Sequence, residues 1–154
     1  ERCTFKVGDI RQSVTEQRDH NLVILGSIGP VLGSIGETLN AVKQCLGNPG
    51  YVLLDDGYKK GEVTTSMHDI PNRGHALAEI AESGFVILDE FVYDAKEIKT
   101  SDIEIFESIK RRALELEQKY PQEKDVLEKY IQDQIRENYV LENEYVCVTW
   151  LLKI

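Results

Sequence analysis

The sequence predicts an α/β domain with a parallel sheet. Two uniformly apolar runs, residues 21–25 and 51–54, flank a segment with a helical pattern. Runs without polar alternation are typical of parallel strands that are covered on both faces. A strand, a helix and a second strand form a βαβ unit, and ligands bind beyond the carboxyl ends of such strands. We therefore expect functional residues directly after residues 25 and 54.

Composition indicates one globular unit and disfavours a membrane or nucleic acid as a partner. A chain of 154 residues, 42% of them hydrophobic, is long enough for one domain with a core and too short for two ordinary ones. Its apolar runs fall short of the roughly 20 residues of a membrane helix and no signal-like stretch opens the chain, so we expect no membrane partner and a cytoplasmic location. The net charge of −9 opposes contact with phosphates, which disfavours nucleic acid as a partner.

Cysteine and histidine give no sign of a metal centre. Cys3, Cys45 and Cys147 are odd in number and far apart in apolar surroundings, which suits reduced and buried thiols. The three histidines lack the i, i+4 spacing of a helical metal pair. We therefore expect no metal.

The amino-terminal part predicts two strands before the first helix. Residues 3–7 alternate between polar and apolar side chains and predict a short strand that a Gly-Asp turn closes. Residues 21–25 are the second strand. Ser34 and Glu37 have the spacing of a capping box, which predicts a helix that ends at a Gly-Asn-Pro-Gly turn over residues 47–50.

The carboxyl-terminal part predicts two strands separated by helices. Residues 57–70 are polar and indicate a mobile loop. Ser101 and Glu104 have the spacing of a second capping box, and Pro121 suits the first turn of another helix. The predicted elements after the loop are a helix over about 72–83, a strand over 85–92, an antiparallel helical hairpin over 101–142, and a strand over 145–152.

The glycine-rich segment over residues 26–36 does not match a dinucleotide-binding loop. Its glycines fall at positions 26, 29, 33 and 36, without the G-x-G-x-x-G spacing. The acids that would hold a ribose lie about thirty residues further on, instead of roughly twenty. No lysine follows the glycines, which excludes a phosphate-binding P-loop.

A set of short motifs in a fixed order gives a second interpretation. The motifs are Gly8-Asp9-Ile10, Asn21-Leu22-Val23-Ile24, Leu46-Gly47-Asn48-Pro49-Gly50 before Tyr51-Val52-Leu53-Leu54, and Ser83-Gly84-Phe85 before the next strand. Together with the terminal apolar strand, this order resembles the class I S-adenosylmethionine-dependent methyltransferases over nearly the whole chain. The resemblance implies a Rossmann-like methyltransferase sheet, mostly parallel with an antiparallel last strand, and S-adenosylmethionine as the cofactor.

The resemblance begins at the third strand of the family. There, the glycine loop that holds the methionine end of the cofactor follows the first strand, and the acid that holds the ribose ends the second. We therefore expect residues 1–154 to be a single α/β domain that lacks its N-terminal strands and cofactor loop, with a helical insertion over 101–142. The alternative is a complete domain in which residues 3–7 pair elsewhere in the sheet.

The resemblance also implies residues that bind the cofactor. Asp9 would accept a hydrogen bond from the adenine amino group, and Ile10 would supply backbone or apolar contact. The alternative is that Asp9 only forms a turn. Gly26, Ser27 and Ile28 would lie beside the transferring methyl group, or they form only a tight connection that requires glycine.

Candidate catalytic residues follow the strand at 51–54 at the same edge of the sheet. An acid at Asp55 or Asp56, with Tyr58 beside it, is placed to deprotonate or orient an acceptor hydroxyl or amine. Alternatively, one of the two acids only caps the turn. His68 and His75 flank the next helix start and would reach the pocket only if the mobile loop closes.

The acceptor follows by elimination. After residue 25 the chain has neither the Asn-Pro-Pro-Tyr motif of family members that methylate adenine or glutamine amino groups nor the Pro-Cys of the cytosine C5 enzymes. This favours a small-molecule substrate. The helical hairpin then covers the acceptor pocket, forms a homodimer surface or simply packs. The competing function is a noncatalytic nucleotide- or cofactor-binding module.

Overall fold

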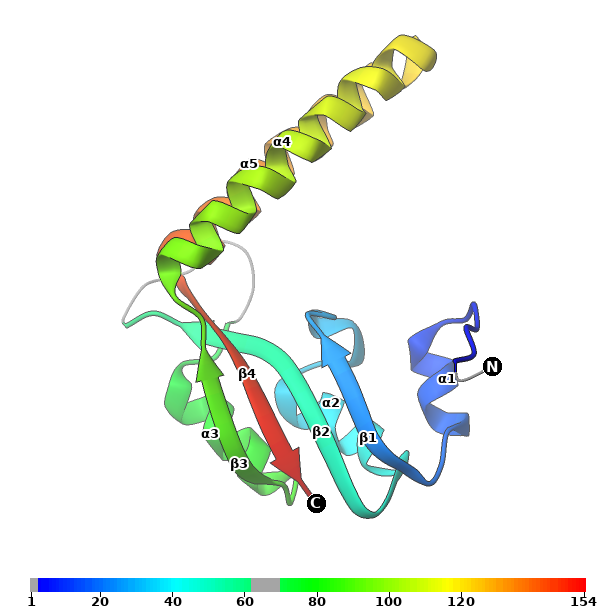
Figure 1. The fold of residues 1–154 in the computed structure, drawn as a ribbon, viewed down its shortest axis with the longest axis vertical. Coiled ribbons are helices and arrows are strands. Elements are labelled where there is room, and N and C mark those ends of the chain that lie inside the picture. Colours follow the sequence, from blue (N-terminus) through cyan, green and yellow to red (C-terminus); the bar gives the residue numbers. More distant parts are fainter. Residues whose placement is uncertain (1–2, 62–69) are drawn as a thin grey trace. The chain divides into compact units, whose positions relative to one another are not determined.

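The computed structural model describes residues 3–61 and 70–154, so His68 and most of the predicted loop over 57–70 lie outside the described residues. Figure 1 colours the chain from its N-terminus to its C-terminus, and the chain divides into two compact units. The first unit contains Glu1–Gly57, Pro71–Phe91 and Val148–Ile154, and the second contains Tyr58–Ile70 and Val92–Cys147. Every predicted site residue except Tyr58 and His68 therefore falls in the first unit.

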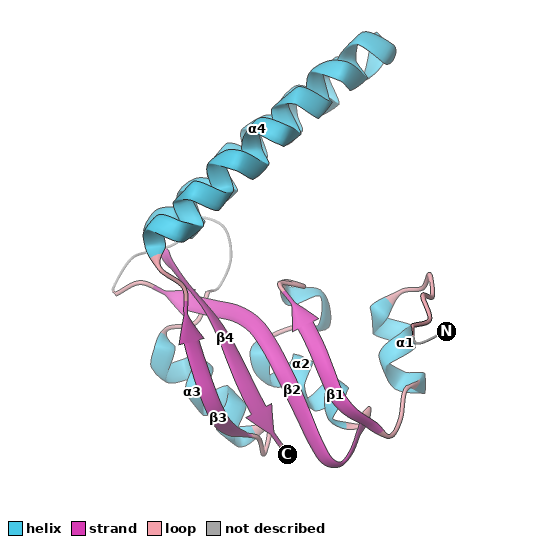
Figure 2. Cartoon of the chain, in the orientation of Figure 1, coloured by secondary structure: helices cyan, strands magenta, loops and turns pink. Residues whose placement is uncertain are grey.

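Four strands form one mixed sheet: β1 (His20–Gly26), β2 (Leu46–Lys59), β3 (Val86–Val92) and β4 (Tyr145–Lys153). Their order is β1-β2-β4-β3, so the last strand of the chain lies between β2 and β3. β1 and β2 are parallel, as the βαβ pattern predicts, and Gly26 lies opposite Asp55. Figures 1 and 2 show the arrow of β4 pointing against those of the other strands.

β2 is longer than the predicted strand over 51–54. It has 14 residues and includes both the predicted turn over 47–50 and the acids after residue 54. The Asn48–Pro49 peptide bond is cis. An added Cβ at the buried Gly50 would lie 2.7 Å from the carbonyl oxygen of Gly47, so the glycine is required by close packing. The predicted turn lies within this strand as an irregularity, because His20 pairs with Leu46 and Leu22 with Tyr51, so that residues 47–50 of β2 stand opposite a single residue of β1.

The helix after β1 begins as predicted. α2 (Ile35–Lys43) follows a short 3-10 turn, η1 (Pro30–Leu32). The hydroxyl of Ser34 accepts from the backbone N–H of Glu37 at 3.3 Å, and the Glu37 carboxylate accepts from the N–H of Ser34 at 2.8 Å. The capping box satisfies amide groups that a helix start leaves unpaired. This part of the prediction is confirmed.

The next helix, α3 (Arg73–Glu82), packs against α2. Its start is capped by the side chain of Asn72, which accepts from the N–H of His75 at 2.8 Å. The carbonyl of Ser83, at its end, accepts from Lys43 Nζ of α2 at 3.0 Å. The helix predicted over about 72–83 is therefore confirmed.

Only one face of the sheet carries a buried core among the described residues. Figure 1 shows α2 and α3 behind the strands, and the buried side chains of these helices include Leu39, Val42, Ala76 and Ile80. The strand residues on the covered face are Leu25, Val52, Leu54, Val148, Trp150 and Leu152, all under 4% exposed. The residues that alternate with them include Leu22 and Ile24 of β1, which are 48% and 64% exposed. The prediction of strands covered on both faces is thus met on one face only.

The predicted strand over residues 3–7 was wrong. Residues 3–9 have no regular structure, and the side chains of Phe5 and Val7 are exposed. Alternation over five residues forms a strand only beside a partner strand, and none of the described strands pairs there. The chain instead enters α1 (Ile10–Glu16), which the polar sequence after residue 10 did not indicate.

α1 packs against η1 and α2 within the first unit. Val14 is its buried residue, and the Val14 carbonyl accepts from the thiol of Cys45 at 3.2 Å. Burial raises the pKa of the Cys45 thiol, while nearby Arg18 opposes this shift. A buried thiol with a raised pKa is unreactive, as expected of a structural cysteine. Cys3 is exposed and Cys147 is half-buried, so the expectation of buried thiols is met at Cys45 and not at the other two positions.

Two long helices dominate the second unit: α4 (Ala95–Lys119) and α5 (Lys124–Asn143), joined by a 3-10 turn, η2 (Pro121–Glu123). They pack against each other between β3 and β4 of the sequence. At their base, the N–H of Tyr93 donates to the carbonyl of Cys147 at 3.1 Å. The chain therefore enters and leaves this pair of helices at neighbouring points.

The capping box predicted at Ser101 was wrong. α4 begins six residues earlier, where the Asp94 side chain accepts from the N–H groups of Lys96 and Glu97. Ser101 lies inside the helix. A stronger cap upstream satisfies the first amides, so a later Ser with Glu three residues on has no free amide to bind.

Asp102 carries an unfavourable charge in the packed helix pair. Its Oδ2 is buried and has no hydrogen-bonding partner among the described residues. Burial, and to a lesser degree the Glu142 carboxylate, raise the pKa of Asp102 above its ordinary value of 3.8. The folded helices therefore bind this proton more tightly than the unfolded chain does, and stability is lost as the pH rises through the folded-state pKa.

Substitution of Asp102 tests this charge. Asp102→Asn is expected to raise the melting temperature of the helices at pH 7, because it removes the buried charge, and the gain should fade as the pH falls towards 3.8. Thermal melts followed by circular dichroism at several pH values measure it. Glu104→Gln, at an exposed position of α4, is the matched control and should change little. A gain that is independent of pH would contradict the assignment.

A pair of leucine truncations tests the one-sided core. Leu54 is 1% exposed and Leu88 is 50% exposed. We expect Leu54→Ala to lower the free energy of unfolding by about 2–5 kcal/mol and Leu88→Ala by less than about 1 kcal/mol, because only the first opens a cavity. Chemical denaturation provides both values. Equal losses would mean that the second face of the sheet is also packed.

Candidate functional site

The chain turns sharply at the carboxyl end of β1. Gly26 is the last residue of the strand, and Ser27 follows with φ of 49°, in the left-handed region that non-glycine residues rarely adopt. Gly29 also has a positive φ, of 62°. An added Cβ at Gly26 or Gly29 would meet no atom within 4 Å. The backbone at this turn is therefore open to a ligand.

Asp55 holds the strained turn in place. The N–H of Ser27 donates to the Asp55 carbonyl at 3.2 Å, and the Ser27 hydroxyl donates to Asp55 Oδ2 at 2.5 Å. The other carboxylate oxygen, Oδ1, accepts from the hydroxyl of Thr149 in β4 at 3.0 Å. One carboxylate thus links the ends of β1 and β2 to β4, and both of its oxygens are engaged.

The structure brings Gly26, Ser27 and Asp55 together. The other residues predicted at this edge of the sheet are Ile28, Asp56 and Tyr58. Ile28 follows Ser27 and is half-buried. Asp56 Oδ1 accepts from the N–H of Gly57 at 2.8 Å. Tyr58 continues β2 but belongs to the second unit.

Asp9 and Ile10 lie at the start of α1. Asp9 is the N-cap, and its carboxylate accepts from the backbone N–H of Arg11 at 2.9 Å and from the Arg11 guanidinium at 2.7–3.1 Å. Hydrogen bonding from the Arg11 side chain and backbone lowers the pKa of Asp9. Ile10 is half-buried as the first residue of the helix. An adenine amino group at Asp9 would compete with this ion pair.

Sequence reasoning missed Thr149. It lies 94 residues from Asp55, within a terminal strand that reads as almost continuously apolar. The available signal was that Thr149 is the one polar residue in the run Val148-Thr149-Trp150-Leu151-Leu152. A hydroxyl among buried apolar residues needs a partner, and Asp55 supplies it.

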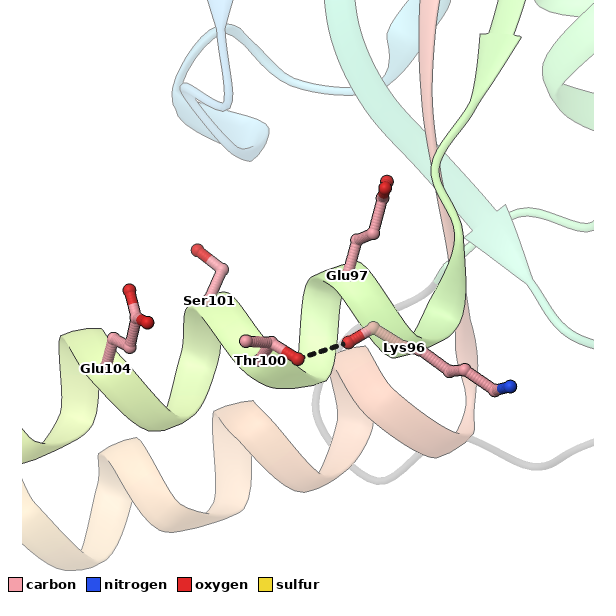
Figure 3. Close-up of a pocket in the computed structure, with 5 residues that line it drawn as sticks. All are labelled: Lys96, Glu97, Thr100, Ser101 and Glu104. Carbon is pink, nitrogen blue, oxygen red and sulfur yellow. Dashed lines mark hydrogen bonds between the residues drawn. The ribbon is translucent and has the colours of Figure 1, made fainter.

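A shallow hollow lies on α4, in the second unit. It has a volume of about 370 Å³ and is lined by Lys96, Glu97, Thr100, Ser101 and Glu104. Figure 3 shows Glu97, Ser101 and Glu104 projecting away from α5, and the Thr100 hydroxyl bound to the Lys96 carbonyl at 2.9 Å. Because all five residues belong to one helix, the hollow cannot enclose a small molecule as a ligand pocket does.

Two further classes of site find no support in the described residues. Over residues 3–61 and 70–154, no three His, Cys, Asp or Glu side chains gather in a way that could hold a metal ion. In those same ranges, none of the helices combines the length and apolarity needed to cross a membrane.

Comparison with solved structures identifies the fold. A methyltransferase from Geobacter sulfurreducens, in complex with S-adenosylhomocysteine, aligns with a TM-score of 0.74 and 13% identity over 97% of this chain and 63% of that one. The chain has the fold of the class I S-adenosylmethionine-dependent methyltransferases. A cyclopropane synthase from Mycobacterium tuberculosis (TM-score 0.70, 10% identity, covering 90% of this chain and 56% of that one) aligns in the same way. A Thiobacillus denitrificans methyltransferase with S-adenosylhomocysteine aligns at 0.69 and 14%, covering 94% and 62%.

The chain spans 56–63% of the lengths of these methyltransferase structures. No protein-family model and no curated protein matches the sequence. The methyltransferase fold is thus recognised from the arrangement of the strands and helices, at identities where sequence alone gives no match.

The Asp55 link provides a test within the first unit. We expect Asp55→Ala to lower the free energy of unfolding by about 1–3 kcal/mol, because two hydroxyl groups lose their acceptor. Ser27→Ala should cost less and should couple to Asp55→Ala by about 0.5–1.5 kcal/mol in a double-mutant cycle. Chemical denaturation of the two single variants and the double variant measures the coupling. Additive effects would show that Ser27 and Asp55 do not act together.

Proposed function

We propose that this chain forms part of a methyltransferase that uses S-adenosylmethionine and acts on a small-molecule acceptor. The observation that carries the proposal is the methyltransferase fold with an open, glycine-containing turn at the carboxyl end of β1, held by Asp55 of β2. Ligands of open α/β sheets bind at this edge. S-adenosylmethionine, when bound, supplies a methyl group on a positively charged sulfur.

The residues of the turn suit contact with such a cofactor through the backbone. Gly26 and Gly29 leave space where a side chain would stand, and Ser27 is held in a fixed conformation. We assign Asp55 to positioning this turn, because its oxygens already bind Ser27 and Thr149. Asp56 and Tyr58 stay as the candidates for orienting an acceptor. Orientation of donor and acceptor can supply much of the rate of such a transfer, so few catalytic groups are needed.

We further propose that the cofactor site is completed by polypeptide that pairs with the free edge of β1. Within the described part of the chain, β1 is an edge strand, and its Leu22 and Ile24 are exposed. The aligned methyltransferases are longer than this chain, which supports the same view. The expected cofactor loop and the ribose-binding acid would then be contributed across that edge.

A noncatalytic cofactor-binding module is the second candidate. It is favoured by the bonding of one predicted catalytic acid, because the carboxylate of Asp55 already accepts hydrogen bonds from two hydroxyls. A module of this kind would bind S-adenosylhomocysteine without forming it from S-adenosylmethionine.

Calorimetric titration tests the proposal. S-adenosylhomocysteine is titrated into this 154-residue chain and into the longest polypeptide that its gene encodes. We expect binding by the longer polypeptide alone, and a Gly26→Ala variant of it should bind about tenfold more weakly or worse, because a methyl group obstructs close approach to the backbone. Binding by the short chain would refute the completed-site proposal, and binding by neither would refute the methyltransferase proposal.

A matched glycine variant controls for folding. Gly47→Ala lies at the opposite end of β2, where the added Cβ meets only ordinary contacts at 3.6 Å. It should leave the affinity unchanged. Incubation of the longer polypeptide with S-adenosylmethionine and a panel of small hydroxyl and amine acceptors then separates the two candidates, since only an enzyme releases S-adenosylhomocysteine when an acceptor is added.

A further inference from the structure

One exposed stripe of α4 has a symmetric order of side chains. Ile103, Glu107, Lys110 and Leu114 are spaced by four, three and four residues, so they share one face of the helix. Ile103 and Leu114 are 53% and 61% exposed. Glu107 and Lys110, between them, form an ion pair with each other. The palindromic stripe, as these four residues are called here, therefore has the order apolar, acid, base, apolar.

α5 extends the same side of the helix pair. Lys99, one turn before Ile103, forms an ion pair with Glu142 at 3.4 Å. Tyr139 and Ile135 lie three and seven residues before Glu142, on the same face of α5. They are 59% and 46% exposed. Two exposed side chains of α5 thus share a helix face with Glu142, the partner of Lys99.

The Leu114 end of the stripe borders a hollow. The hollow has a volume of about 320 Å³ and is lined by Leu114, Glu117, Gln118, Pro121 and Lys124. The ion pair of Lys124 Nζ with Glu117, at 3.2 Å, lies in its wall. An apolar residue and a recess beside a second apolar residue therefore occupy opposite ends of one face, about 16 Å apart along the helix at 1.5 Å per residue.

This arrangement is self-complementary only for an antiparallel neighbour. A two-fold axis midway between Ser108 and Ile109 places Ile103 opposite Leu114 and Glu107 opposite Lys110 of the second copy. A two-fold interface requires this reciprocity: if residue i of one copy contacts residue j of the other, residue j of the first copy contacts residue i of the second. A parallel neighbour would instead place Glu107 against Glu107 and Lys110 against Lys110, and like charges disfavour that alignment.

We infer that the palindromic stripe is a homodimer interface, in which α4 of one copy packs antiparallel against α4 of a second copy. The Ile103 side chain of each copy enters the hollow beside Leu114 of the other. The two Glu107–Lys110 pairs exchange partners between copies and fix the alignment. All of these residues belong to the second unit, so the inference depends neither on the cofactor nor on the proposed reaction.

Sedimentation velocity of the full chain over a range of concentrations tests the inference. We expect a dimer that dissociates on dilution. Glu107→Lys should weaken the dimer about tenfold or more, since it places two pairs of like charges across the axis. The charge-swapped variant with both Glu107→Lys and Lys110→Glu should restore the dimer, because the opposite charges face each other again.

A second ion pair of α4 supplies the matched control. Arg112 and Glu115 have the same i, i+3 spacing as the Glu107–Lys110 pair but lie outside the stripe. Glu115→Lys should leave dimerisation unchanged, and circular dichroism should show equal helix content in all variants. A monomer at every concentration would overturn the inference. So would a dimer that Glu107→Lys does not weaken, or a double variant that fails to recover.

Discussion

Burial of one face of the sheet is the constraint on which the first unit depends. Val52, Leu54, Trp150 and Leu152 come from two strands that are neighbours only in space, and α2 and α3 cover them. Removing this apolar area from water is the main favourable term in folding. Three features keep this apolar face buried: Ser34 caps α2, α3 packs against α2, and the last strand lies between β2 and β3.

The polar counterpart of that core is the carboxylate of Asp55. It lies where the covered strands end, and its two oxygens bind hydroxyls from β1 and β4. An acid whose two oxygens each accept a hydrogen bond is suited to hold a neighbouring loop in place. The same residue that sequence analysis placed among the catalytic candidates therefore explains why Ser27 can hold a left-handed conformation at the ligand edge.

Sequence patterns correctly predicted those elements that depend on residues close together in the chain. The capping box at Ser34 and Glu37, the helix that Asn72 begins, and the parallel pairing of β1 with β2 follow from nearby side chains. The errors arose where distant contacts decide the outcome. The alternation at residues 3–7 had no partner strand, and β2 continues on both sides of the predicted segment over 51–54. The link between Asp55 and Thr149 joins residues 94 positions apart, which no local pattern contains.

The hydrogen bond between Tyr93 and Cys147 has a consequence for how this molecule can vary. Because it joins the points at which the chain leaves β3 and enters β4, the residues between them can be lengthened, shortened or replaced without separating the two strands. A short turn would serve as the minimal connection. The segment between Tyr93 and Cys147 is thus a place where an insertion of different length or sequence leaves the pairing of β3 with β4 intact.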